Sequence, residues 1–303
     1  MSLPMRLLYC HCAHAQATPR AAREAALSEL CASGLPLETV ADLCVAAARR
    51  APELRRLAAS GPLLIAACAP RAVSALFDAA NAPLPPETTH YVNLRATAPE
   101  SLAETVRSLP GAHAAPPLEP FATVWKRLET HAPEPDGWTG WAPVIDAGRC
   151  TGCMQCLSFC LFGVYAAEEG RVAVREPAQC KPNCPACARV CPEAAILFPK
   201  HPAETIHGGT VPGGAPRPVP KADLSALLGG DLYSVLRARN SPRFSPDRSP
   251  EAALEERREC LAALAREGGI PLEVLENLPP TPELAQRAAQ AQAAAQEARE
   301  QKR

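Results

Sequence analysis

Two dense runs of cysteine stand out in the chain. The first, "CTGCMQCLSFC", occupies residues 150–160, and the second, "CKPNCPACARVCP", occupies residues 180–192. Together they hold eight thiols, which are Cys150, Cys153, Cys156 and Cys160 in the first run and Cys180, Cys184, Cys187 and Cys191 in the second. Three cysteines at two-residue gaps let one loop reach three corners of a metal–sulfur cube, and the fourth corner must come from elsewhere. The two runs therefore indicate metal or redox chemistry.

The composition supports this interpretation. The chain has 303 residues, 14 of them cysteine, and a formal net charge of −1. We find no secretory signal and no apolar run of about 18 residues, so we expect a cytoplasmic protein without direct membrane insertion. In that reducing compartment, closely spaced cysteines favour metal sites over disulfides. The near-neutral charge argues against nucleic acid as a partner.

With these spacings, residues 143–198 resemble a bacterial-type ferredoxin that carries two [4Fe–4S] clusters. In that family the fourth cysteine of each run binds the other cluster. The resemblance therefore implies one cluster on Cys150, Cys153, Cys156 and Cys191, and another on Cys180, Cys184, Cys187 and Cys160. It also implies paired strands at "PVIDAGRC" and "AAILFP". Between them, "VYAAEEGRVAVRE" predicts a hairpin that turns at Glu169-Gly170.

Two residues depart from the family pattern. Leu161 stands where a proline usually follows the first run, and three residues rather than two separate Cys180 from Cys184. The loop must therefore bulge, and the second cluster would be three-iron or labile if Cys180 did not bind. Structural zinc is the alternative, but sites of four thiolates normally draw two CxxC pairs from separate knuckles, which a CxxCxxC triplet does not provide.

The N-terminal region alternates strand and helix signals, which predicts an α/β domain with a parallel sheet over residues 1–112. "MRLLYC" and "PLLIAAC" read as strands that end in Cys10 and Cys68, and "LETVADLC" reads as another that ends in Cys44. The carboxyl ends of parallel strands share one edge of a sheet. We therefore expect Cys10, Cys12, Cys44 and Cys68 to lie close together.

The same residues carry a second resemblance, to the N-terminal region of the heterodisulfide reductase A subunit. "CHC" at 10–12, Cys44, "AACAPR" at 66–71 and "NLR" at 93–95 follow that family's order. For the four thiols we keep three alternatives open: a third [4Fe–4S] cluster, a redox-active thiol or disulfide, or small buried hydrophobes. No G-x-G-x-x-G follows a strand, so we expect neither FAD nor NAD.

For six further residues the sequence gives only weak indications of a role. Cys31 and Cys260 fall inside predicted helices without partners, and we interpret them as packing residues. His11 and His14 are expected to be surface loop residues. Arg71 and Arg95 either stabilise a cluster's negative charge or form ordinary salt bridges.

The rest of the chain divides by composition. Residues 113–142 are predicted to be a linker before the ferredoxin-like domain at 143–200, and 201–222 a second linker rich in Gly and Pro. Residues 223–303 are expected to form a helical tail with a disordered end. Within it, "SPEAALEERRECLAALAREGG" predicts a helix with Ser249 as its N-cap, and "GDLYSVLRARNSPRF" is a candidate anchor on a partner.

The first hypothesis for function is an electron-transfer protein that serves as a subunit or adapter of a larger oxidoreductase. Its partners would be redox proteins, and we expect a component rather than a stand-alone enzyme. The second is a catalytic subunit whose N-terminal cysteines reduce a disulfide or similar substrate. The third is an iron–sulfur redox sensor, which no DNA-reading helix or basic stripe supports.

Overall fold

The computed structural model describes residues 4–14, 18–109, 119–130, 137–168, 170–211 and 248–268. Two compact units are distinguished. The first comprises Met1–Val144 and Phe198–Gly209, and the second comprises Ile145–Leu197 and Thr210–Arg303. The short segment that follows the second cysteine run therefore belongs to the N-terminal unit.

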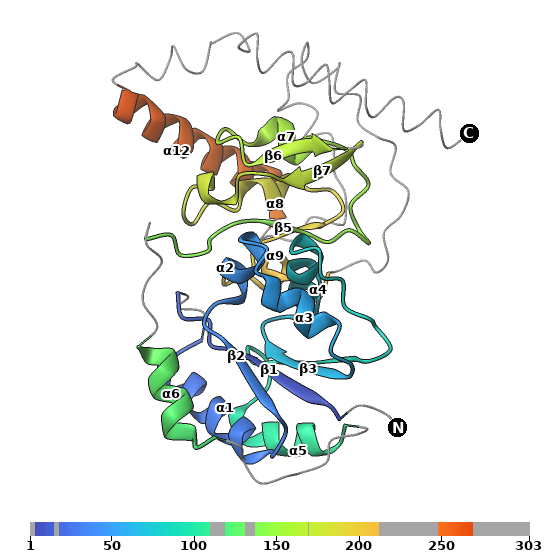
Figure 1. Cartoon of the computed structure of the whole chain (residues 1–303). Helices are drawn as coiled ribbons and strands as arrows, with labels where there is room; N and C mark the ends of the chain where they lie inside the picture. The colour runs from blue at the N-terminus through green and yellow to red at the C-terminus, as the bar shows by residue number, and fades with distance from the viewer. Residues whose placement is uncertain are drawn as a thin grey trace, which may run out of the picture. The chain divides into compact units, whose positions relative to one another are not determined.

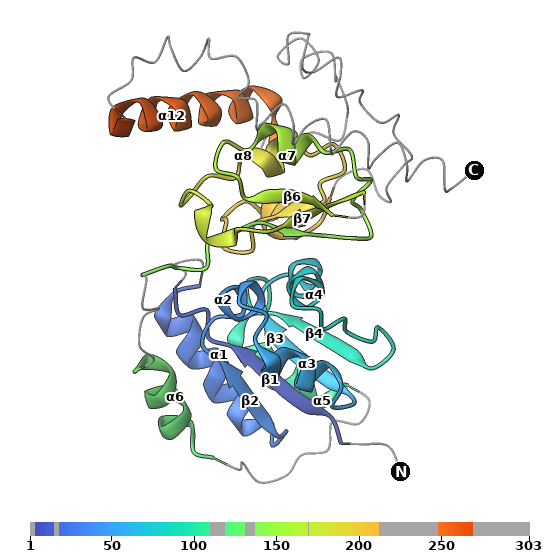
Figure 2. The same ribbon diagram turned by 45° about the horizontal axis from the view of Figure 1, so that its top comes forward.

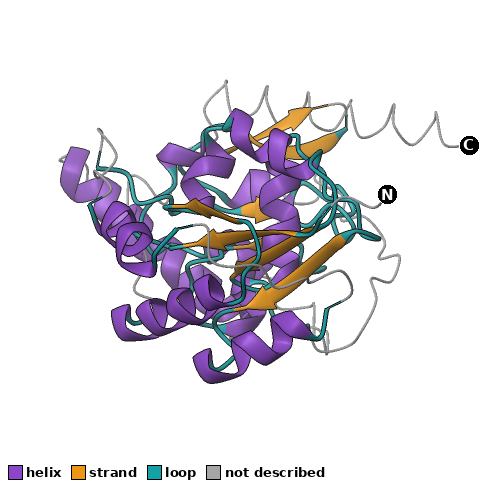
Figure 3. Cartoon of the chain, turned by 60° about the horizontal axis from the view of Figure 1, so that its bottom comes forward, coloured by secondary structure: helices purple, strands orange, loops and turns teal. Residues whose placement is uncertain are grey.

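The first unit is built on a parallel sheet of four strands. Their order is β2-β1-β3-β4, with β1 at Arg6–Cys10, β2 at Leu37–Val40, β3 at Leu63–Ala67 and β4 at Thr89–Asn93. β1 pairs with both β2 and β3, so that Leu8 lies opposite Glu38 and Ile65. All of β3 is buried, because helices cover both faces of the sheet, as in other all-parallel sheets. Figure 3 shows these helices on the two sides of the strands. The predicted α/β domain is confirmed.

The helices form two layers (Figure 1). One layer holds α1 (Arg20–Ala32), η1 (Pro99–Ser101), α5 (Leu102–Arg107) and α6 (Phe121–Glu129), and the other holds α2 (Leu43–Ala48), α3 (Pro52–Ala58) and α4 (Pro70–Ala79). Apolar residues of β1, α1, α5 and α6 form one buried cluster, which includes Leu7, Leu27, Leu102, Val124 and Leu128.

Three expectations for this unit need correction. The strand at "LETVADLC" ends at Val40, and Cys44 lies in the first turn of α2, because Asp42 caps that helix by accepting from the N–H groups of Cys44 and Val45. Part of the predicted linker 113–142 forms α6, whose apolar face joins the core. Part of the predicted linker 201–222 forms α9 (Glu204–His207).

The second unit contains the secondary structure predicted around the cysteine runs. β5 (Val144–Ile145) pairs with β8 (Ile196–Leu197), and β6 (Tyr165–Glu168) forms an antiparallel hairpin with β7 (Arg171–Val174). Three short helical elements connect them, which are α7 (Gln155–Phe159), η2 (Pro177–Gln179) and α8 (Ala186–Val190). The paired strands and the hairpin are confirmed.

One helix of the tail, α12 (Pro250–Gly268), belongs to this second unit and lies along α8 (Figure 2). Its predicted N-cap is confirmed, because the N–H of Ala252 donates to Ser249 Oγ at 3.0 Å. The candidate anchor at 230–244 and the end of the tail lie outside the described residues. No helix in the described part of the chain is long and apolar enough to cross a membrane.

The burial of α6 gives a prediction for stability. Leu128 is buried in the core of the first unit, whereas Lys126 on the same helix is exposed. We expect Leu128→Ala to lower the free energy of unfolding by about 2–5 kcal/mol, because it leaves a cavity. The change can be measured by denaturant titration with tryptophan fluorescence, since all three tryptophans lie in this unit.

Lys126→Ala is the matched control and should stay within about 0.5 kcal/mol of the wild type. Equal stability of the two variants would show that α6 is a linker after all.

Candidate functional site

The cysteines of the first run share a cavity with one cysteine of the second run. Cys150, Cys153, Cys156 and Cys191 all line it, together with apolar residues such as Val172 and Ile196. Cys150 and Cys153 lie in a loop that contains two left-handed residues, Gly152 with φ 66° and Met154 with φ 61°, and Cys156 follows in α7. This is the set of four thiols that the ferredoxin resemblance implies for one cluster.

The remaining cysteines form a second group. Cys160, at the end of the first run, lies close enough to Cys180 and Cys187 for its charge to act on both thiols. The hydroxyl of buried Tyr165 donates to Cys187 Sγ at 3.0 Å. Burial is the main cause that raises the pKa of Cys180 to about 12, and the negative charge of the nearby Cys160 is a smaller one. The fourth cysteines of the two runs are thus exchanged between the groups.

The additional residue between Cys180 and Cys184 is accommodated by a turn. Asn183 has φ 61°, and the N–H of Cys184 donates to the carbonyl of Lys181 at 3.2 Å. Asn183 precedes Cys184 as Gly152 precedes Cys153, and asparagine tolerates this left-handed conformation better than most residues. The predicted bulge is therefore present, and Cys180 still lies near Cys160.

The interpretation of Cys260 as a helix residue without partners is wrong. Its Sγ lies 3.8 Å from Cys184 Sγ, and Lys181 Nζ lies 3.5 Å from it. The hydrogen bond with Cys184 and the charge of Lys181 lower the pKa of Cys260 to about 6. The prediction failed because α12 brings Cys260 to this group from a distant part of the sequence. Cys31, in contrast, packs against the core of the first unit as expected.

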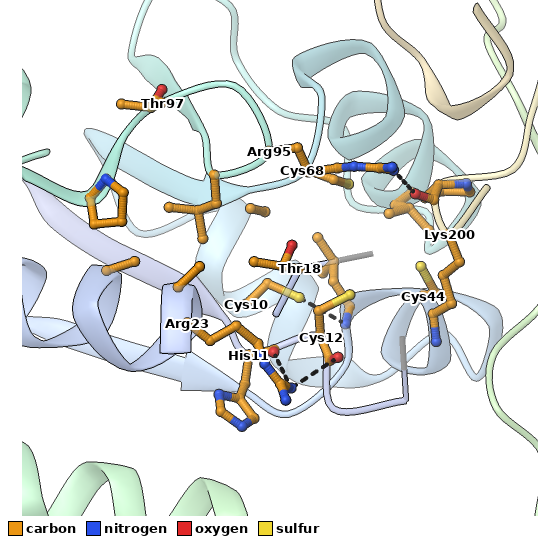
Figure 4. A pocket seen from close by; sticks show the side chains of 18 residues that line it. Cys10, His11, Cys12, Thr18, Arg23, Cys44, Cys68, Arg95, Thr97 and Lys200 are labelled. Carbon is orange, nitrogen blue, oxygen red and sulfur yellow. Dashed lines mark hydrogen bonds between the residues drawn. The ribbon is translucent and has the colours of Figure 1, made fainter. Parts of the chain in front are cut away.

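In the first unit, the four cysteines singled out from the sequence line one cavity (Figure 4). Cys10 ends β1, Cys12 follows in a loop with φ 53°, Cys44 lies on α2, and Cys68 comes directly after β3. The N–H of Leu43 donates to Cys10 Sγ at 3.4 Å. The expected convergence at the carboxyl edge of the sheet is observed, because the four cysteines line the same cavity.

Sequence reasoning missed Lys200, which lines this cavity, and its ion-pair partner Asp42. Lys200 Nζ lies 2.7 Å from Asp42 Oδ2, and both side chains are buried. Lys200 also donates to the carbonyl of Thr139, and Asp42 caps the helix that carries Cys44. Lys200 follows the second cysteine run and returns to the first unit, so no local pattern could have revealed this ion pair.

The cavity of the first unit combines buried thiols with positive charge. Burial is the main cause that raises the pKa of Cys68 to about 12, and the negative charge of the nearby Cys12 is a smaller one. Burial also raises the pKa of Cys44. Lys200 and Arg95 oppose these shifts as nearby cations. Any metal that binds these sulfurs must therefore displace their protons, and its binding should strengthen as the pH rises.

Arg95 and Arg71 bind main-chain oxygens. Arg95 Nη1 donates to the carbonyls of Pro199 and His201 at 2.9 and 3.0 Å, which holds the segment with Lys200 over the cavity. Arg71 donates to the carbonyl of Gly209 at 3.3 Å. Because the charge of Arg95 also acts on Cys68 and Cys12, the structure favours the charge-stabilising interpretation for this residue over an ordinary salt bridge.

The expectation of surface histidines is wrong for His11. Its side chain is buried, and its Nε2 lies 3.3 Å from Glu129 Oε1 on α6. Burial is the main cause that lowers the pKa of His11, and the positive charge of Arg23 lowers it further. His11 is therefore a neutral packing residue at neutral pH. His14 is only partly buried.

Within the described ranges, no three His, Cys, Asp or Glu side chains are assembled as a site for one metal ion. The cysteines instead line two cavities in fours. His11 also lines the first and Glu193 the second, but sulfur is the most frequent donor of metal-ligand type in both. Thiolate sulfur is a soft ligand that suits iron–sulfur clusters. The donor chemistry of both cavities therefore fits a cluster rather than a hard cation.

The buried ion pair gives a prediction for the first unit. Lys200→Met removes the charge but keeps the length of the side chain, and it leaves Asp42 buried without its cation. We expect the free energy of unfolding to fall by about 3–5 kcal/mol, as measured by tryptophan fluorescence in a denaturant titration.

The double variant Lys200→Met/Asp42→Asn is the control, because asparagine can still cap α2 without carrying a charge. It should recover much of the lost stability. If the double variant were as unstable as Lys200→Met, the loss would come from packing and not from the unpaired carboxylate.

Comparison with known proteins finds a similar protein for one segment of the chain. A segment of 60 residues is 52% identical to an uncharacterized ferredoxin of Methanocaldococcus jannaschii, and it covers 20% of this chain and 41% of that protein. The chain thus spans less than half the length of this curated relative. No family model matches the chain, and no solved structure matches it significantly. The chain contains a segment similar to a ferredoxin.

Proposed function

We propose that this protein transfers single electrons through iron–sulfur clusters, as a subunit or adapter of a multi-component oxidoreductase. The observation that carries the proposal is the shared cavity of Cys150, Cys153, Cys156 and Cys191. Three of these residues lie on one short segment that runs from a loop into α7, and the fourth comes from the other run, as in proteins that hold two neighbouring clusters. The similarity to a ferredoxin points in the same direction.

Two [4Fe–4S] clusters are proposed for the second unit. Cys150, Cys153, Cys156 and Cys191 would hold one, and Cys160, Cys180, Cys184 and Cys187 would hold the other. Such clusters, when bound, exchange one electron at a time. The chain supplies hydrogen bonds to the sulfurs, since the N–H of Ala195 donates to Cys191 Sγ at 3.3 Å and Tyr165 donates to Cys187 Sγ.

A third cluster is proposed for the N-terminal cavity. Its four thiols come from β1, the loop after β1, α2 and the residue that follows β3, and they meet at the edge of the sheet where ligands of parallel sheets bind. Lys200 and Arg95 add positive charge next to them. Lys200 also pairs with Asp42 and Arg95 also binds main-chain carbonyls, but the charge of each acts on a neighbouring thiol, which supports a group of thiolates over simple packing.

A second candidate function is thiol–disulfide chemistry in the same cavity. Cys10 and Cys12 are linked by a side-chain hydrogen bond, which raises the pKa of Cys10 and lowers that of Cys12. A more acidic thiol next to a second thiol is the arrangement used to reduce disulfides. The second unit would then deliver the electrons. Both functions need redox proteins as partners, and a location in the cytoplasm remains part of the proposal.

The iron content tests the proposal. The protein would be purified without oxygen, and its iron and acid-labile sulfide would be measured together with the EPR spectrum of the reduced protein. We expect about twelve irons per chain, because each of three cubes holds four. Cys68→Ala should lower the count to about eight and leave the clusters of the second unit intact.

About eight irons in the wild type, unchanged by Cys68→Ala, would favour thiol chemistry in the N-terminal cavity. Zinc in place of iron, or a colourless protein without sulfide, would contradict the proposed function as a whole.

Tyr165 gives a further prediction. Tyr165→Phe removes a hydrogen bond of about 0.5–1.5 kcal/mol to a cluster ligand. Losing this donor destabilises the reduced cluster, which is the more negative of the two redox states. The midpoint potential of the second cluster should therefore fall by about 20–60 mV, because 59 mV corresponds to a tenfold change in a one-electron equilibrium. Redox titration followed by EPR measures the shift. Tyr91→Phe, on β4 of the first unit, is the matched control and should leave that potential unchanged.

A further inference from the structure

Helix α12 is attached to the unit of the cysteine runs at several points. Arg189 Nε lies 2.8 Å from Glu256 Oε1, and Arg257 donates to the carbonyl of Phe159. Ala253 is fully buried in a small apolar cluster with Phe159 and Val190. Buried Arg248, just before the helix, donates to two carbonyl oxygens of the same unit. These contacts determine which face of α12 meets the cysteine loops.

That face presents Cys260. The residue is only 3% exposed, and its sulfur lies 3.8 Å from the sulfur of Cys184. Lys181, from the loop between Cys180 and Cys184, places its ammonium 3.5 Å from Cys260 Sγ. The ammonium of Lys181 would offset the negative charge of a metal-bound sulfur at this position.

The second group therefore offers five sulfurs for a cube with four corners. Its members are Cys160, Cys180, Cys184, Cys187 and Cys260. The sulfurs of Cys184 and Cys260, 3.8 Å apart, would compete for the same iron of a cluster bound here.

We propose that Cys260 is an alternative ligand for the corner that Cys184 binds in the second cluster. In the exchange, the bond between iron and Cys184 Sγ breaks and a bond between the same iron and Cys260 Sγ forms. The entering thiol loses its proton and the released thiolate gains one, and no electron moves. The inference rests on the proposed function, and it makes the second cluster tolerant of losing either thiol.

The proposed first cluster allows the loss of Cys184 to be compared with the loss of a ligand that has no spare thiol beside it. Cys153 corresponds to Cys184 as the second cysteine of its run, and the cavity of the first group is lined by four cysteines among the described residues. Without a spare sulfur, loss of Cys153 should remove a corner ligand outright. The two positions should therefore respond differently to the same substitution.

The experiment uses the full chain, prepared without oxygen, with iron and sulfide analysis and EPR as readouts. Cys184→Ala and Cys260→Ala should each keep the iron content and spectrum of the wild type. Cys184→Ala/Cys260→Ala should lose between one and four irons per chain, as a three-iron cluster or none remains. Cys153→Ala alone should lose a similar amount. Cys184→Ala/Cys31→Ala is the matched control and should resemble Cys184→Ala, because Cys31 lies in the core of the first unit.

Two results would overturn the inference while the proposed function stands. One is a loss of iron in Cys184→Ala as large as in the double variant, and the other is such a loss in Cys260→Ala alone. A Cys184–Cys260 disulfide in the iron-loaded wild type would also overturn it, because both thiols would then be withdrawn from iron. A wild type without iron would instead remove the proposed function, and this inference with it. The cluster that a substitution does not touch reports that the unit has folded: the first cluster for substitutions of Cys184 or Cys260, and the second cluster for Cys153→Ala.

Discussion

The main physical constraint on this protein is the burial of thiols in groups, which would have to ionise together to hold the proposed clusters. Neighbouring thiolates repel one another, and burial disfavours each of them further, as the raised pKa values of Cys68 and Cys180 show. Positive charge has to compensate. The chain places Lys200 and Arg95 at the N-terminal cavity, Lys181 at the second group and Arg171 near Cys150. Bound iron would complete this compensation, which couples metal binding to the stability of the sites.

The two units satisfy the constraint in different ways. In the first, a parallel sheet with two helical layers supplies a large apolar core, and the thiols occupy one edge of a scaffold that holds together without them. In the second, strands of two to four residues and helices of five surround the cysteines. Such a small unit buries little apolar surface, so metal ligation is expected to provide much of its stability.

The segments outside the two cysteine runs do more than connect domains. The stretch after the second run returns to the first unit, where Lys200 pairs with Asp42 and Arg95 holds the main chain nearby. Helix α12 adds Cys260 to the second group. Each segment brings a charged or sulfur-bearing side chain to a group of thiols, so that both sites depend on parts of the chain that a motif search would treat as linker or tail.

The sequence by itself determined the features that depend on local spacing and on the resemblance that this spacing carries. The ferredoxin resemblance of the cysteine runs implied which thiols would share a cavity, and the alternation of strand and helix signals predicted the sheet whose edge gathers Cys10, Cys12 and Cys68. Only the tertiary structure decided that Cys44 starts a helix, that α6 joins the core, and that Lys200 and Cys260 reach sites 158 and 76 residues away from them. Contacts over such separations leave no periodic signal, because the intervening chain can vary freely without changing which side chains meet.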